Sequence, residues 1–313
     1  MIKIDLITGF LGSGKTTFIK KYVQYLLDQG LKVGIIENDF GAVNVDMMLL
    51  QDIMSDNCEL EMVAGACDLD CHRRRFKTKL ISMKMRGFDR IVIEPSGIYD
   101  VDEFFDVLHE EPLDSWYEIG NVLAIVDGRL SRNLSKQARY LLASQITVAG
   151  QIILSKVQQT YQNDIDNTIQ YLNNALKEFH GKEKAIADFI CKDWDLLNNE
   201  DYQRILNCGY KYDSIEKLWF NQNEVFDTLY FMNKRFSKEQ FIAIVNKLMN
   251  DKECGTIFRI KGFSLLEDNS WIELNATSEN IEIKPIENGQ EIIIVIGENL
   301  VEKQIQKYFK YIR

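Results

Sequence analysis

The chain has 313 residues, a formal net charge of −10, 46% hydrophobic residues and only three prolines. This composition is typical of a fully globular protein with one large or two ordinary domains. The negative charge argues against a general nucleic-acid binder, because neutralising phosphates requires a basic surface. Apolar runs such as 292–296 are too short to span a bilayer, and the six unevenly spaced cysteines suit reduced thiols. We therefore expect a cytoplasmic protein that has neither nucleic acid nor a membrane as a partner.

The most informative motif covers residues 9–16, which read Gly-Phe-Leu-Gly-Ser-Gly-Lys-Thr and fill the phosphate-loop pattern Gly-x-x-x-x-Gly-Lys-[Ser/Thr]. A β-branched apolar stretch precedes the motif, and apolar residues at helical spacing follow it. In this strand–turn–helix context the backbone N–H groups of the turn form an anion site. Lys15 then reaches the β- and γ-phosphates, and the Thr16 hydroxyl ligates Mg²⁺. The predicted nucleotide-binding residues of the motif are Gly9, Gly12, Ser13, Gly14, Lys15, Thr16 and Thr17.

Strands and helices alternate over the first half of the chain, which implies a parallel sheet with crossover helices. The expected strands after the phosphate loop are 32–37, 90–94, 121–127 and 151–154, with a helix over 165–179. The last sixty residues change to short strands at 255–263, 270–274 and 291–296 and a terminal helix at 301–311. We predict an α/β phosphate-loop nucleotide-binding domain over 1–185, a helical connecting region over 186–250 and a small α+β domain over 251–313.

A second phosphate-side motif is predicted at residues 90–97, where an apolar strand ends in Glu94 and Gly97 follows three residues later. Glu94 is positioned to hold the Mg²⁺ shell, and Gly97 lets its backbone N–H approach the γ-phosphate. An acid-rich loop that contains Asp39 and Asp46 follows the expected strand at 32–37. Because loops at the carboxyl ends of such strands face the ligand, we expect this loop to sense the γ-phosphate. The predicted catalytic residues are Lys15, Asp39, Asp46 and Glu94.

Taken together, these segments resemble the CobW-type GTPases, the metallochaperone relatives of the HypB and UreG maturation proteins. The resemblance rests on Gly-Phe-Leu-Gly-Ser-Gly-Lys-Thr-Thr at 9–17, Glu-Asn-Asp-Phe-Gly at 37–41, Glu-Pro-Ser-Gly at 94–97 and Arg-Ile-Lys-Gly at 259–262. It covers nearly the whole chain. It implies a nucleotide-dependent switch that loads or guards a transition metal for a client protein. We expect such a switch to hydrolyse GTP slowly, because its triphosphate form must persist.

The chain departs from this family at the cysteine motif, which usually reads Cys-x-Cys-Cys after the switch loop. Only Cys67 fits that frame here, although Cys71 and His72 follow closely and Cys58 lies nine residues upstream. These side chains, with Glu37 as an oxygen ligand suggested by the family, form a candidate site for Zn²⁺ or Co²⁺. The alternative is that the cysteines are reduced, partly buried residues of a switch segment.

A second departure lies at the base-recognition motif, where the family has Asn-Lys-x-Asp and this chain has Ser155, Lys156 and Gln158 in the corresponding positions. The aspartate of the family accepts hydrogen bonds from guanine, whereas the amide of Gln158 both donates and accepts. We favour GTP because the rest of the loop aligns. ATP remains the alternative, as does a base held mainly by stacking and backbone contacts.

Three functions are consistent with these motifs. The first is a metallochaperone or metal-insertion switch for a client metalloprotein. The second is an NTP-hydrolysing switch that activates a cofactor-dependent enzyme, such as a corrinoid protein, without carrying metal. The third, a small-molecule phosphate-loop kinase, is disfavoured because Glu94–Gly97 and the segment at 259–262 have no role in it. The sequence leaves the client and any homo-oligomer open.

Overall fold

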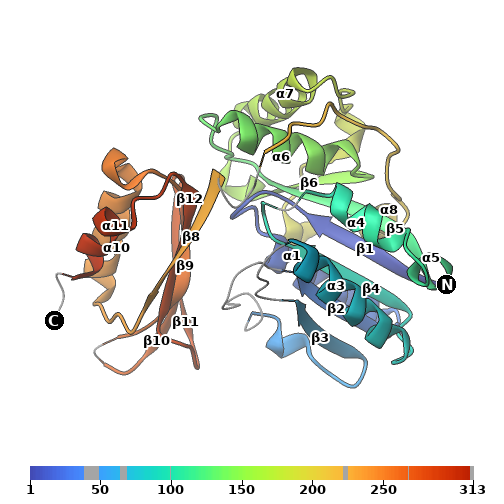
Figure 1. Cartoon of the computed structure of the whole chain (residues 1–313), viewed down its shortest axis with the longest axis horizontal. Coiled ribbons are helices and arrows are strands. Elements are labelled where there is room, and N and C mark those ends of the chain that lie inside the picture. The colour runs from blue at the N-terminus through green and yellow to red at the C-terminus, as the bar shows by residue number, and fades with distance from the viewer. Residues whose placement is uncertain (39–48, 64–68, 99, 221–224, 267, 311–313) are drawn as a thin grey trace. The chain divides into compact units, whose positions relative to one another are not determined.

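The computed structural model of the chain describes residues 1–38, 49–63, 69–98, 100–220, 225–266 and 268–310. Its contacts divide it into two compact units, Met1–Leu218 and Trp219–Arg313. The first unit is an α/β domain built on a parallel sheet, and the second is a smaller domain built on an antiparallel sheet (Figure 1). These architectures confirm the predicted fold class.

In the described part of the first unit, seven parallel strands pair in the order β3-β2-β4-β1-β5-β6-β7. All residues of β4 are buried, as are those of β2 and β6, because helices cover both faces of the sheet. The parallel arrangement brings the carboxyl ends of these strands to one edge, where Asn38 is level with Pro95 and Asp127 with Ser155. The strands are β1 (Ile2–Thr8), β2 (Val33–Asn38), β3 (Cys58–Val63), β4 (Arg90–Pro95), β5 (Tyr117–Asp127), β6 (Gln151–Ser155) and β7 (Phe189–Ile190).

Two separate apolar cores cover the two faces of this sheet. On one face α1 packs Phe18 and Val23 against alternate strand residues such as Ile7, whereas on the other face α3 and α4 contribute Phe76 and Phe104. The helices of the unit are α1 (Lys15–Asp28), α3 (Leu69–Lys84), α4 (Asp102–Leu108), α5 (Leu113–Trp116), α6 (Lys136–Thr147), α7 (Gln162–Glu178) and α8 (Asn199–Leu206). Short 3-10 turns lie at η1 (Gln51–Ile53), η2 (Val157–Gln159), η3 (Ile186–Asp188) and η4 (Trp194–Leu196).

The observed division between the units differs from the predicted boundaries at 185 and 250. Residues 186–218 belong to the first unit, because β7 pairs with β6 and the side chain of Ile205 on α8 is buried in the core on the α1 side. The rest of the expected helical connecting region, including the helix Lys238–Asn250, is part of the second unit. The sequence analysis also did not predict β3 or β7.

The second unit consists of a five-stranded antiparallel sheet in the order β11-β10-β9-β12-β8, with two helices against it. Its own core contains Phe231, Phe241, Val295 and Phe309. The strands predicted at 255–263, 270–274 and 291–296 are present, whereas β8 and β11 were not predicted. The elements are β8 (Phe226–Met232), α10 (Lys238–Asn250), η5 (Lys252–Cys254), β9 (Thr256–Leu265), β10 (Trp271–Thr277), β11 (Asn280–Ile286), β12 (Ile292–Glu298) and α11 (Glu302–Lys310).

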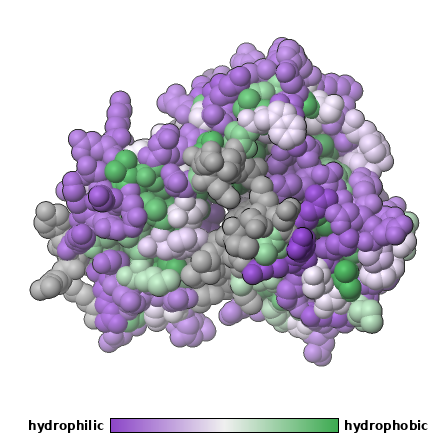
Figure 2. All heavy atoms as spheres, in the orientation of Figure 1, coloured by the Kyte–Doolittle hydropathy of each residue, from purple (hydrophilic) through white to green (hydrophobic). Residues whose placement is uncertain are grey.

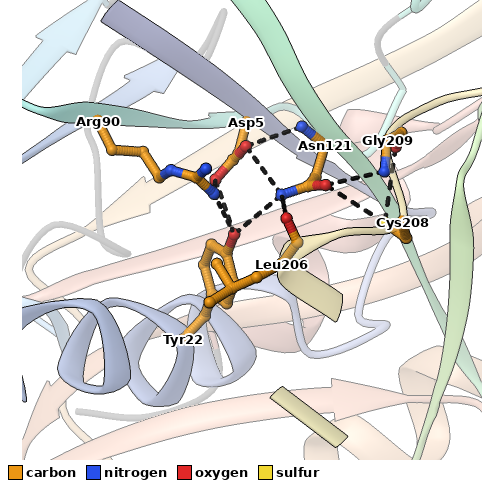
Figure 3. A network of polar contacts seen from close by, with 7 residues as sticks. All are labelled: Asp5, Tyr22, Arg90, Asn121, Leu206, Cys208 and Gly209. Atoms are coloured by element: carbon orange, nitrogen blue, oxygen red, sulfur yellow. Dashed lines mark hydrogen bonds and ion pairs between the residues drawn. The ribbon is translucent and has the colours of Figure 1, made fainter. Parts of the chain in front are cut away.

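A buried polar network fixes α1 to the sheet below the phosphate loop (Figure 3). The Asp5 carboxylate on β1 accepts hydrogen bonds from the Tyr22 hydroxyl on α1 at 2.7 Å and from the Arg90 guanidinium on β4 at 2.8 Å. Its other oxygen accepts from the backbone N–H of Asn121 on β5 at 2.8 Å. The Asn121 side chain in turn accepts from the backbone N–H of Gly209 at 2.9 Å. One carboxylate thus connects three strands, the helix of the phosphate loop and, through Asn121, the segment after α8.

The outer surface is mainly hydrophilic on the face shown in Figure 2, where apolar side chains are scattered in small groups. The large apolar side chains are instead concentrated in the cores of the two units. Among the residues that the structure describes, no helix has the length and apolar character needed to cross a membrane.

Candidate nucleotide and metal site

The phosphate loop lies between β1 and α1 at the carboxyl edge of the sheet. Gly9 has a φ of 151°, and a side chain there would collide with the Ile125 carbonyl at 2.2 Å. Glycine is therefore required at this position, because the loop turns directly against β5. Gly12 and Gly14 also have positive φ values of 73° and 97°. The Lys15 ammonium donates to the Gly9 carbonyl at 3.0 Å, so the lysine folds over the loop that it is predicted to serve.

The predicted Mg²⁺ ligands lie side by side. The Thr16 hydroxyl donates to a Glu94 carboxylate oxygen at 2.8 Å, although the two residues are 78 positions apart in sequence. Glu94 is only 7% exposed, at the end of β4. A hydroxyl and a carboxylate oxygen are ligands that suit a hard cation such as Mg²⁺, so this donor set fits the ion. Thr17, the next predicted residue, is exposed at the start of α1.

Gly97 lies directly against the phosphate loop. A side chain at this position would come within 2.7 Å of the Leu11 backbone nitrogen. Only a residue without a Cβ allows this approach. The Gly97 carbonyl accepts a hydrogen bond at 3.1 Å from the side chain of Gln145, a fully buried residue of α6. The structure therefore brings the predicted γ-phosphate glycine and the phosphate loop together.

The predicted base-recognition segment lies on the opposite side of the loop. The Lys156 ammonium contacts the Gly12 carbonyl at 3.3 Å and the Asp127 carboxylate at 2.5 Å, and its backbone is left-handed with a φ of 57°. Ser155 is buried at the end of β6, whereas Gln158 is exposed in η2. Lys156 therefore joins the base segment to the phosphate loop, and Asp127 is a partner that the sequence analysis did not identify.

Four buried side-chain oxygens gather at this edge of the sheet without a hydrogen-bond partner among the residues that the structure describes. They are Thr8 Oγ1, Ser13 Oγ, Asn38 Oδ1 and Ser155 Oγ. Each belongs to the end of a strand or to the phosphate loop itself. Buried polar atoms are normally paired, so these oxygens fit an edge that binds a polar ligand such as a nucleotide.

A further residue of the site is Trp194, which the sequence analysis did not identify as a site residue. Its ring meets Phe18 of α1 edge-on at 5.2 Å between centroids, and its Nε1–H donates to the Leu154 carbonyl at 3.0 Å. The neighbouring Asp195 pairs with Lys21 of α1 at 2.6 Å. The loop after β7 therefore supports the helix that begins at the phosphate loop.

The structure does not bring all the predicted transition-metal ligands together. Cys58 is buried at the amino end of β3, whereas Glu37 is level with Met62 of the same strand. Cys58 and Met62 are four residues apart on β3, and a strand rises by about 3.3 Å per residue, so Cys58 and Glu37 lie about 13 Å apart along the strand direction. The Cys58 side chain packs in the core on the α1 face, and burial raises its pKa to about 11, which disfavours the thiolate that metal binding needs. Cys58 therefore does not fit a site shared with Glu37.

Three of the other predicted metal ligands are among the described residues. Cys71, partly exposed, and His72, buried, occupy the start of α3, and Glu37 is buried near the end of β2. Cys67 lies outside the described residues, as do Asp39 and Asp46. Among the described residues alone, no group of three or more histidine, cysteine, aspartate or glutamate side chains is arranged to hold a metal ion.

Comparison with known proteins identifies relatives of this chain. YeiR, a zinc chaperone of Escherichia coli (strain K12), is 30% identical over 161 residues, which are 51% of this chain and 48% of YeiR. The match thus spans about half the length of that relative. The zinc-regulated GTPase metalloprotein activator 1 of Schizosaccharomyces pombe is 22% identical over 345 aligned positions, which cover 96% of this chain and 83% of the activator.

Among solved structures, the Zn(II)-bound YjiA GTPase of E. coli aligns with 100% of this chain and 99% of its own, at 19% identity and a TM-score of 0.37. The model of the CobW/HypB/UreG nucleotide-binding domain matches residues 3–186, which include the phosphate loop, the Glu94–Gly97 motif and the segment of Lys156. This match covers more than half of the chain, and the protein therefore belongs to the CobW/HypB/UreG family.

Proposed function

We propose that the chain is a Mg²⁺-dependent molecular switch that binds GTP in preference to ATP and hydrolyses it slowly. The observation that carries this proposal is the 2.8 Å contact between Thr16 and Glu94, beside Lys15 and against the loop that Gly97 approaches. A phosphate cradle, a hard-cation donor pair and a γ-phosphate glycine are the parts that such switches use. Asp39 and Asp46 stay our candidates for positioning water or completing the Mg²⁺ shell.

The switch is proposed to load zinc, or a similar ion, into a client metalloprotein. Support comes from the names of the relatives, two of which describe a zinc chaperone and a metalloprotein activator. The ligands that we propose are Cys67, Cys71 and His72, with Glu37 or water completing a four-ligand shell.

A second candidate function is a switch that activates a cofactor-dependent enzyme without carrying metal. The position of Cys58 favours it, because this cysteine is removed from the ligand set and the remaining thiols do not have the usual family spacing. The two functions are separated by whether the protein takes up a metal ion in either nucleotide state.

Hydrolysis by the isolated chain should be well below the usual enzyme range of about 1–10³ per second. A switch has to persist in its triphosphate form long enough for a partner to recognise it. Several turnovers per second without added metal or partner would contradict the switch proposal.

The nucleotide site is tested by Lys15→Ala, with Lys20→Ala as the control. Lys15 would meet the β- and γ-phosphates, and a hydrogen bond to a charged group contributes about 1.5–3 kcal/mol, so affinity should fall about 10- to 100-fold. Lys20 lies on the same helix but is ion-paired to Asp52 at the surface, so its loss should leave affinity unchanged. Calorimetric titration with a non-hydrolysable GTP analogue measures both. Equal affinities of Lys15→Ala and the unmodified chain would refute the assignment.

A further inference from the structure

The loop that follows β5 is held against the predicted base-recognition segment. The Gly128 N–H donates to the Ser155 carbonyl at 3.0 Å, and the Gly128 carbonyl accepts from the Thr168 hydroxyl of α7 at 2.9 Å. The backbone N–H of Arg129 donates to the Asp127 carboxylate at 2.9 Å, so the turn closes on the last residue of β5. Arg129 is therefore fixed at the carboxyl edge of the sheet, beside the segment that we expect to contact the base.

The Arg129 side chain carries hydrogen-bond donors that the described part of the chain does not use. Its Nε and Nη2 atoms are buried, and neither makes a hydrogen bond to a described residue. An Asp127 carboxylate oxygen lies 3.9 Å from Nε, which is too long for a hydrogen bond. A guanidinium keeps its charge in proteins, so burying its donors without acceptors is costly unless a ligand supplies them. The side chain is 21% exposed, so a ligand at this edge can reach it.

The charges around Arg129 favour a ligand that offers hydrogen-bond acceptors. The Asp127 carboxylate faces the Lys156 ammonium at 2.5 Å as well as Arg129, so one negative charge is shared between two positive charges. Lys156 also contacts the Gly12 carbonyl of the phosphate loop at 3.3 Å, so two of its three donors are already engaged. Among these three described side chains, Arg129 is therefore best able to donate to a ligand.

We infer that Arg129 recognises the guanine base by donating from its guanidinium to the O6 and N7 atoms. A guanidinium matches these two acceptors with a pair of hydrogen bonds, whereas adenine presents an amino donor in place of O6. Arg129 therefore selects GTP over ATP. This inference rests on the proposed nucleotide switch and names a residue that determines its base specificity.

The position of Arg129 favours the base over the phosphates as its ligand. Its loop packs directly on Ser155 of the predicted base-recognition segment, whereas Lys15 and the phosphate loop are the proposed partners of the phosphates. Gln158 replaces the carboxylate of the family motif with an amide that can satisfy guanine only in part. A charged donor beside this segment therefore supplies discrimination that Gln158 alone lacks.

Competition of GTP, GDP and ATP against a fluorescent nucleotide analogue tests this assignment in the full chain. Arg129→Met keeps an unbranched apolar side chain and removes the donors. We expect its affinities for GTP and GDP to fall about 5- to 150-fold, the range of a good bidentate base contact, whereas its affinity for ATP should not fall. Arg129→Lys keeps the charge but not the paired donors, so it should also lose most of the preference for GTP. Denaturant unfolding should show no loss of stability in Arg129→Met, because the side chain makes no hydrogen bond to a described residue through Nε or Nη2.

Arg132→Met is the matched control, because Arg132 is an exposed arginine three residues further along the same loop. This variant should keep the ratio of GTP to ATP affinity of the unmodified chain. The role of Arg129 is refuted, and the switch is left intact, if Arg129→Met also keeps that ratio. It is refuted as well if Arg129→Met weakens GTP and ATP equally, because Arg129 would then act on the phosphates or on the fold. Failure of the unmodified chain to bind either nucleotide would instead refute the switch itself.

Discussion

At the scale of single residues, Lys156 explains how the predicted base-recognition segment keeps its position although Gln158 replaces the aspartate of the family motif. Its ammonium contacts the Asp127 carboxylate and the Gly12 carbonyl, so the lysine side chain is fixed between the predicted base-recognition segment and the phosphate loop. Gln158 follows two residues later on an exposed turn, where no other part of the described chain constrains it in a recorded contact. The identity of the side chain at this position should therefore control base preference without affecting the fold.

Gln158→Asp should sharpen the preference for GTP over ATP. A carboxylate accepts from two guanine donors, and a good bidentate base contact contributes roughly 1–3 kcal/mol of discrimination, or about 5- to 150-fold. Competition of both nucleotides against a fluorescent analogue measures the ratio. Gln159→Asp adds the same charge one residue further along the same turn and should leave the ratio unchanged. An unchanged ratio in Gln158→Asp would mean that the base is recognised elsewhere.

At the scale of elements, the network around Asp5 determines how firmly α1 is attached to the sheet. Burial raises the pKa of Asp5, and the ion pair with Arg90 and the hydrogen bond from Tyr22 oppose that rise. Asp5→Asn would leave the Arg90 guanidinium buried without a countercharge. Breaking a buried pair in this way costs about 3–5 kcal/mol of unfolding free energy. Denaturant unfolding measures the loss.

A surface ion pair provides the contrast to this network. Glu110 receives Lys77 and Arg73 at 2.6 Å each, but all three side chains are about a third exposed. Glu110→Gln should therefore cost no more than about 1 kcal/mol. If Asp5→Asn costs as little as Glu110→Gln, the buried network does not hold the helix.

Glu103 on α4 makes the stability of the first unit depend on pH. Burial, and then the charge of Asp100, raises the pKa of Glu103 from 4.5 to about 7, with Lys217 and Arg73 opposing and Asp106 adding to the rise. Below about pH 4.5 the carboxyl is protonated in both folded and unfolded chains. Between about pH 4.5 and pH 7 Glu103 is protonated in the folded chain but ionised in the unfolded chain, so the free energy of unfolding falls as the pH rises towards about 7.

Glu103→Gln should remove this contribution. Its melting temperature should exceed that of the unmodified chain at pH 8 and should show a smaller decline between pH 5 and pH 8. Calorimetric melting at several pH values measures both effects. Glu118→Gln, an exposed substitution on β5, is the control and should keep the original pH profile. A Glu103→Gln chain with the same decline as the control would show that Glu103 does not keep its proton.

The elements that could be predicted from the sequence are those whose signals are local. The phosphate loop, its strand and its helix lie within the first 28 residues, and each carries its own pattern. β3 was not predicted, because Glu59 and Glu61 alternate with apolar residues and leave no continuous apolar run like those of the predicted strands. In the structure these carboxylates pair with basic residues, as in the 2.6 Å contact between Glu61 and Lys79 of α3.

Contacts between residues that lie far apart in the sequence could not be predicted from the sequence. The network of Asp5 was not predicted, because its partners at positions 22, 90 and 121 are brought to it only by the folded sheet. Cys58 is a second example. Its position nine residues before Cys67 suggested a metal ligand, but β3 places its side chain in the core on the α1 face of the sheet. Spacing along the chain predicts neighbours on one helix or strand, whereas sites that several strands share depend on register.

At the scale of the whole molecule, the two units have separate cores, and the residues of the proposed nucleotide site all belong to the first unit. Any action on a client that involves the second unit must therefore be transmitted from the nucleotide edge. Cys71 and His72 stand at the start of α3, on the chain segment that follows the predicted switch loop. A metal bound there would be close in sequence to the loop that we predict to sense the γ-phosphate, so metal and nucleotide should affect each other.

Metal uptake should require Cys67 and Cys71 together. The chain should bind about one Zn²⁺ or Co²⁺, and replacing both cysteines by serine should abolish that binding while nucleotide affinity is kept, because neither thiol belongs to the phosphate loop. Cys191→Ser, which changes an exposed cysteine after β7, should have no effect.

Uptake of the metal should release protons and weaken below neutral pH, since only deprotonated thiols bind. The factor by which GTP changes Zn²⁺ affinity should equal the factor by which Zn²⁺ changes GTP affinity. Zn²⁺ titration with and without GTP measures the first factor, and GTP titration with and without Zn²⁺ measures the second. If the chain takes up no metal in either state, the metal-carrying function fails, and activation of a client enzyme by the nucleotide switch alone becomes the better account.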